Sequence, residues 1–148
     1  MPDVRVAALV QAPPEQVWAA QVDGPGIAKW FPGARAVTDI TGPLDRPGTT
    51  YALRFRRFVR SRVEITEVEP PVMHTRTWNA SPLGTRGRAT VFMHPEDGGT
   101  RVDLDVRYRL PFGPIGRMLE GRSWVRHRAA RDIRRELLAF AEFAERAQ

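Results

Sequence analysis

Three histidines, His74, His94 and His127, are the residues of this chain best suited to acid–base or metal chemistry. None has a second histidine or a glutamate at the spacing that builds a metal site on a helix. The chain has no cysteine, which excludes disulfides, thiolate nucleophiles and cysteine metal ligands. We therefore predict that the protein binds no metal and needs no cofactor.

The histidines differ in the side of the protein that they should face. His94 stands at the end of a predicted strand, and His127 lies opposite the apolar side of a predicted helix, so both should face solvent. The facing of His74 stays open, because successive residues of a strand point to opposite faces. One face would carry Val72, His74, Arg76 and Trp78, and the other Met73, Thr75 and Thr77.

Serine and carboxylate chemistry has little support in the sequence. The serines at positions 61, 81 and 123 lie outside any Gly-x-Ser-x-Gly turn, and the chain has no glycine-rich phosphate loop. The pairs Asp103/Asp105 and Glu67/Glu69 each share one face of a strand, as coupled acids would. Asp103 and Asp105 stand opposite the apolar residues of their strand, so we interpret them as outward partners of neighbouring arginines.

The last third of the chain shows what must position these residues. Apolar and charged residues alternate strictly over 101–110, which predicts a strand. From Ile115 the apolar spacing becomes helical and predicts one helix of roughly thirty residues, about 45 Å long. A helix of that length held by a curved sheet usually encloses a cavity, so a ligand is the first functional question.

The remaining segments predict an α+β domain in the order β-α-α-β-β-β-β-β-β-α, with two short helices after the first strand. Its length predicts a single domain over residues 1–148. The sequence has no long apolar run and no leader-like N-terminus, so we expect a cytoplasmic protein.

The formal net charge of +6 depends almost wholly on arginine, since Lys29 is the one lysine. Many arginines alternate with acids, which favours an ordinary solvated surface. Two denser groups leave open a surface for nucleic acid, an anionic membrane or a protein partner, with nucleic acid disfavoured because the charge is not confined to one tail. These groups are Arg54, Arg56, Arg57, Arg60 and Arg62, and Arg117, Arg122, Arg126 and Arg128.

Several motifs together resemble the START-like, polyketide cyclase/dehydrase superfamily, often called SRPBCC. They are "APPEQVWAA", "IAKWFPG", "VEITEVEPP", "GGTRVDLDV" and "LPFGPIGRM". The resemblance covers nearly the whole chain and implies a helix-grip fold, in which a seven-stranded antiparallel sheet wraps around the long C-terminal helix. It also implies a hydrophobic cavity between the sheet and the helix.

The residues agree with such a cavity, because Ala129 and Ala130 lie in the middle of the helix, where larger side chains would fill the space below. Large strand side chains such as Trp78 and Phe92 could instead fill the gap. The predicted ligand-binding residues are Tyr51, Leu53, Phe55, Val63, Ile65, Trp78, Leu104, Val106, Tyr108, Met118, Arg122, Val125 and Arg126.

Among these residues, Arg122 carries the sharpest hypothesis. It falls one turn from both Met118 and Val125, so its guanidinium either snorkels to solvent or binds the carboxylate or enolate of a ligand at the cavity rim. An exposed Trp124 beside the arginines could also mark a homodimer contact.

Three functions remain open at this stage. The first is binding of a hydrophobic lipid or polyketide-like molecule, as a carrier or sensor. The second is a metal-independent cyclase or dehydratase, with catalytic residues unknown and candidates His74, Arg76, Tyr51, Tyr108, Arg122 and Arg126. The third is an arginine-rich interaction surface.

Overall fold

The structure is a computed structural model that describes residues 3–56, 58–82 and 84–146. In chain order its elements are β1 (Asp3–Val10), α1 (Pro14–Gln21), α2 (Ile27–Trp30), β2 (Ala36–Thr38), β3 (Thr50–Arg54), β4 (Arg60–Glu69), β5 (Met73–Ser81), β6 (Arg86–Glu96), β7 (Gly99–Arg109), α3 (Gly113–Glu120) and α4 (Ser123–Arg146). Pro14 occupies the first turn of α1, where its missing N–H costs nothing. Within the described ranges, none of the helices is long and apolar enough to span a membrane.

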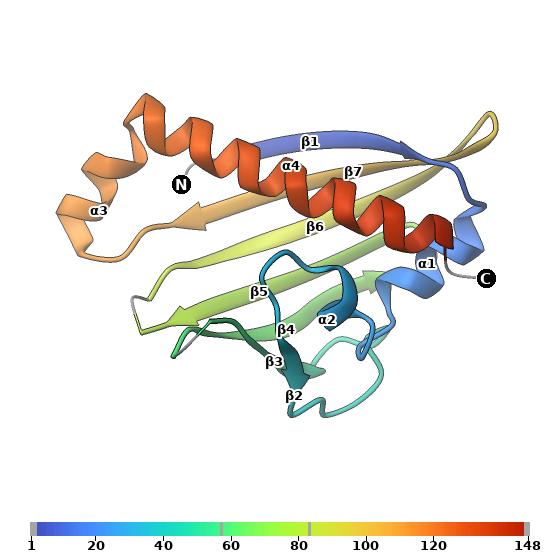
Figure 1. Ribbon diagram of the computed structural model, residues 1–148, viewed down its shortest axis with the longest axis horizontal. Helices are drawn as coiled ribbons and strands as arrows, with labels where there is room; N and C mark the ends of the chain where they lie inside the picture. The colour runs from blue at the N-terminus through green and yellow to red at the C-terminus, as the bar shows by residue number, and fades with distance from the viewer. Residues whose placement is uncertain (1–2, 57, 83, 147–148) are drawn as a thin grey trace.

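The strands form one antiparallel sheet of seven strands in the order β1-β7-β6-β5-β4-β3-β2. Helix α4 crosses one face of this sheet (Figure 1). Helices α1 and α2 contact α4, and α3 lies beyond the N-terminal end of α4. The predicted α+β, helix-grip fold is therefore confirmed.

The prediction of one unbroken C-terminal helix is wrong, because the structure divides it into α3 and α4 at Gly121 and Arg122. The side chain of Glu120 turns inward at the end of α3, and its Oε2 accepts a hydrogen bond from the Leu110 amide at 3.4 Å. Glycine next to it has low helix propensity. Helix α4 alone has 24 residues, which makes it about 36 Å long.

Strand β4 settles which residues of β5 face the helix. A bulge between Ile65 and Glu67 leaves Ile65 and Val68 on the same, inner face, although three positions separate them. Their partners in β5 are Arg76 and His74, so these two residues also face inward. The open question about this strand is thus resolved in favour of the face with His74, Arg76 and Trp78.

The core is most complete under the C-terminal half of α4. Leu137, Phe140 and Ala144 are buried against β1, β6 and β7 and against α1. Trp30 of α2 meets the ring of Phe140 edge-to-face at 5.2 Å. The short helices therefore hold this half of α4 against the sheet.

The outward carboxylates on β7 have the partners that the sequence predicted. Asp103 lies 3.3 Å from Arg101 and 3.5 Å from His94, and Asp105 lies 3.5 Å from Arg5 of β1. They occupy the sheet face opposite α4, where these partly exposed pairs stabilise only weakly.

Candidate ligand-binding cavity

A cavity of about 410 Å³ lies between the sheet and the N-terminal half of α4. This is within the range of small-molecule sites. Its walls are mostly apolar and come from Phe31 just after α2, the inner faces of β3 to β7 and one side of α4. The lining residues are Phe31, Leu53, Phe55, Ser61, Val63, Arg76, Trp78, Ala80, Thr85, Ala89, Val106, Tyr108, Leu110, Trp124, Val125, Arg128, Ala129, Asp132, Ile133 and Glu136.

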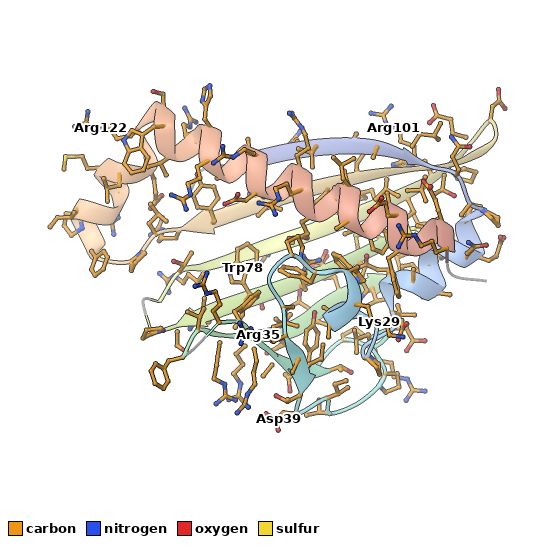
Figure 2. The ribbon with its side chains drawn as sticks, viewed as in Figure 1. Lys29, Arg35, Asp39, Trp78, Arg101 and Arg122 are labelled. Carbon is orange, nitrogen blue, oxygen red and sulfur yellow. The ribbon has the colours of Figure 1, made fainter. Side chains whose placement is uncertain are left out.

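The roof of the cavity is formed by successive turns of α4. Val125, Ala129 and Ile133 recur every four residues and so point down from one side of the helix. Ala129 has only a methyl group to offer, so the space beneath it stays open. Figure 2 shows Trp78 on β5 below this part of the helix.

An ion pair closes the deep end of the cavity. A guanidinium nitrogen of Arg76 donates to Glu136 Oε2 at 2.6 Å, and both side chains are nearly buried. Burial lowers the pKa of Arg76, but the charge of Glu136, with Tyr51 and the hydrogen bond, outweighs this and leaves the pKa raised. Arg76 is therefore a fixed cation with a fixed counter-charge.

Tyr51 supports this ion pair from the core side. Its side chain is buried, and burial raises the pKa of its phenol, with Arg76 opposing and Glu136 adding to the effect. Tyr51 stays a neutral phenol at physiological pH. The pair itself thus presents no net charge to the cavity, whose lining also includes the exposed Arg128 and Asp132.

Tyr108 brings an unused polar group to the cavity. Its ring lines the wall, and its hydroxyl is buried without a hydrogen-bond partner among the described residues. Burial is the main cause of its raised pKa, with Arg126 opposing and Glu120 adding. A buried hydroxyl without a partner carries an unmet desolvation cost.

The structure brings together part of the predicted ligand-binding set. Leu53, Phe55, Val63, Trp78, Val106, Tyr108 and Val125 line the cavity. The remaining predicted residues lie elsewhere. Tyr51, Ile65 and Leu104 are packed in the core, Met118 is exposed on α3, and Arg122 and Arg126 are exposed at the surface.

The rim-arginine hypothesis loses its geometric basis. Arg122 lies between α3 and α4 at the edge of the molecule (Figure 2), exposed and outside the cavity lining. The helix break causes this, since Arg122 would share a side with Val125 only in a continuous helix.

Glu136 is one of several lining residues that sequence reasoning missed, and it is the one that pairs with Arg76. It follows Val125, Ala129 and Ile133 on the cavity side of α4, and an acid on an apolar stripe was the available signal. Its partner Arg76 was named only as a candidate, because the facing of β5 was open. That Arg76 and Glu136 face each other is apparent only when the bulge in β4 is known, because the bulge decides that Arg76 faces inward.

His74 faces inward but serves the core rather than the cavity. Its Nε2 donates to the Leu44 carbonyl at 2.8 Å, and its Nδ1 accepts from the Gln21 amide at 3.3 Å. Burial lowers the pKa of His74 to about 4, with the Leu44 carbonyl opposing that effect. His94 and His127 are exposed, as predicted, and the described residues contain no group of acidic or histidine side chains suited to hold a metal ion.

The sheet, the long helix and the cavity between them define a helix-grip protein of the START-like, SRPBCC class. The chain belongs to the family described as polyketide cyclase / dehydrase and lipid transport, whose model matches residues 1–145. No curated protein matches the chain.

Solved structures show the same fold. MLL2253 from Mesorhizobium loti is 18% identical with a TM-score of 0.74, over 99% of each chain. TTHA0849 from Thermus thermophilus is 23% identical with a TM-score of 0.69, over 97% of each chain. DynU16, a protein of the dynemicin biosynthetic locus, is 18% identical with a TM-score of 0.71; the match covers 99% of this chain and 48% of that one, so this chain spans about half of DynU16.

Proposed function

We propose that the protein binds a hydrophobic small molecule, a lipid or a polyketide-like compound, in the cavity beneath α4 and acts as its carrier or sensor. The observation that carries this proposal is an apolar cavity of about 410 Å³ with one buried, unpartnered hydroxyl on its wall, that of Tyr108. A family that includes lipid transport supports the same role. A cytoplasmic location stays a prediction.

The polar groups favour a neutral ligand with one oxygen function. Arg76 is already neutralised by Glu136, so a ligand carboxylate would bring an uncompensated charge beside Glu136. A ligand hydroxyl or carbonyl could pair with the Tyr108 hydroxyl, which both donates and accepts. We therefore expect a fatty alcohol or methyl ester to bind more tightly than the fatty acid of equal length.

Titration with those three compounds tests the proposal. Ala129→Trp fills the cavity and should abolish binding of all three, whereas Ala130→Trp, one residue along and outside the lining, should not. Tyr108→Phe should lower affinity by about 0.5–1.5 kcal/mol, roughly two- to tenfold. Native mass spectrometry of the purified protein would identify a co-purified ligand. Equal binding by the two tryptophan variants would refute the assignment to this cavity.

A second candidate function is a metal-independent cyclase or dehydratase. The Arg76–Glu136 pair within an apolar cavity favours it, since a cation can polarise a carbonyl and a carboxylate can accept a proton. The likeness to a protein of the dynemicin locus points the same way. Turnover of a poly-β-ketone substrate that Glu136→Gln abolishes, while Tyr108→Phe still binds ligand, would establish it.

A further inference from the structure

One end of the molecule carries both the cavity and an unusual surface. The β3–β4 hairpin, the β5–β6 connection, the end of β7, α3 and the start of α4 lie together there, and we call this region the mouth end (Figure 1). The cavity lining reaches it through Phe55, Thr85, Leu110 and Trp124. A ligand entering the cavity from this end would cross that surface.

Large apolar side chains are exposed on several elements of the mouth end. On α3 and its N-cap, Phe112, Ile115 and Met118 are each about 60% exposed and recur every three residues, so they share one side. Trp124 begins α4 with similar exposure, and Phe58 at the tip of the β3–β4 hairpin is 87% exposed. Soluble proteins rarely leave such side chains together in water without a partner.

The backbone at Phe112 is a second unusual feature of the mouth end. Its φ of 76° lies in the left-handed region, which a bulky residue rarely adopts. Backbone strain of this kind persists only where the surrounding structure imposes it. Here it turns the chain from β7 into α3, and the side chain of Phe112 points into solvent.

The mouth end is also rich in positive charge. Arg54 stands directly opposite Arg60, and Arg86 opposite Arg109, in neighbouring strands, and such like-charged pairs are destabilising in water. The acid of α3, Glu120, is buried, while Arg117, Arg122 and Arg126 are exposed around it. Asp39 lies 3.8 Å from Arg60 and offsets one of these charges.

The opposite end of the molecule carries a group of acids. They occupy the β4–β5 turn, the β6–β7 turn and the last turns of α4, namely Glu67, Glu69, Glu96, Asp97, Glu142 and Glu145. Two arginines of that end, Arg101 and Arg146, have carboxylate partners in Asp103 and Glu142. The chain's positive charge is thus separated along its length, which would orient the molecule mouth-first toward an anionic surface.

We propose that the mouth end docks on an anionic lipid bilayer. Exposed aromatic and aliphatic side chains on an amphipathic helix, flanked by arginines, are the features of proteins that lie in the membrane interface. A protein partner would need to match apolar groups presented by three separate elements, whereas a bilayer adapts to them. This docking surface stands independently of the proposed ligand, although it would let a lipid enter the cavity without crossing water.

Cosedimentation with vesicles tests the proposal. The wild-type protein should bind phosphatidylcholine vesicles that contain phosphatidylglycerol, bind pure phosphatidylcholine far less, and dissociate at high salt. Arg122→Gln with Arg126→Gln should lower binding about 25-fold, and Phe112→Ser with Met118→Ser on the order of tenfold. These side chains are exposed, so the melting temperature should not change.

Matched variants away from the mouth end serve as controls. Leu138→Ser and Arg46→Gln alter an exposed leucine of α4 and an exposed arginine of the β2–β3 loop, and both should bind vesicles as the wild type does. Tryptophan fluorescence should shift to the blue on binding, and Trp124→Phe should remove that shift. The proposal fails if the control variants lose as much binding, if the apolar variants lose none, or if the mouth-end variants instead dissociate a homodimer.

Discussion

The two halves of α4 lie on the same sheet and do different things there. From Leu137 onward the helix is packed, with Leu137 and Phe140 only 3% exposed and Ala144 fully buried. Before that point Val125, Ala129 and Ile133 are half-buried and roof a cavity. Part of the difference is side-chain size, since the inward positions carry Leu137 and Phe140 in the second half and Ala129 in the first.

The support behind the helix also differs. Helices α1 and α2 contact α4 and hold its second half against the sheet, and the ring of Trp30 packs edge-to-face against Phe140. The first half has the curved sheet below it and solvent above. The ion pair between Arg76 and Glu136 stands at the border. The cavity therefore lies where α4 lacks the support of α1 and α2. The packed second half of α4 sets the distance between its first half and the sheet.

The largest loss of stability is expected in the packed half. Phe140→Ala removes a buried ring and leaves a void, which should lower the free energy of unfolding by about 3–5 kcal/mol. Urea denaturation measures this directly. A loss below about 1 kcal/mol would mean that this half is as loosely packed as the other.

The second largest loss of stability is expected at the border between the halves, where Arg76 pairs with Glu136. Glu136→Gln leaves the nearly buried Arg76 without its counter-charge and should cost about 3 kcal/mol. Replacing both residues, as Arg76→Met with Glu136→Leu, should cost much less than the sum of the single changes. Additive losses in that double-mutant cycle would contradict a coupled pair.

Acid should weaken the packed end through His74. Its folded-state pKa of about 4 lies below the ordinary value of 6.5, so the unfolded chain binds the proton more readily. The stabilising effect is complete above pH 6.5 and is lost as the pH falls toward 4, by on the order of 3 kcal/mol. The difference between wild type and His74→Gln in unfolding free energy should follow that window.

The smallest expected changes in stability compare the two halves most directly. Ala144→Leu overpacks the core and should cost about 1–3 kcal/mol, whereas Ala129→Leu extends into the cavity and should change stability by less than about 1 kcal/mol. Thermal unfolding of the two variants measures the difference. Equal losses would show that no usable space lies beneath Ala129.

The fold was predictable because its signals are local and repeated. Strict alternation over the last strand and the order of the elements pointed to a sheet gripping a helix, and the structure confirms it. The length of the helix was mispredicted because a single buried carboxylate, Glu120, decides where it breaks. That contact depends on the Leu110 amide, which no periodicity reveals.

The site was less predictable because its polar centre spans distant segments. Arg76 and Glu136 are 60 residues apart, and the β4 bulge decides whether Arg76 faces inward at all. The separation of charge between the two ends was also hidden. Arginines and acids are interspersed in the sequence. They separate in the structure because successive turns lie at alternate ends of the sheet.

The break between α3 and α4 gives the two helices different local stabilities. Gly116 and Glu120 are the buried residues of α3, so little free energy opposes its detachment, whereas α4 is tied to the core through its second half. Amide hydrogens of α3 should therefore exchange with solvent through local opening, far faster than those around Phe140.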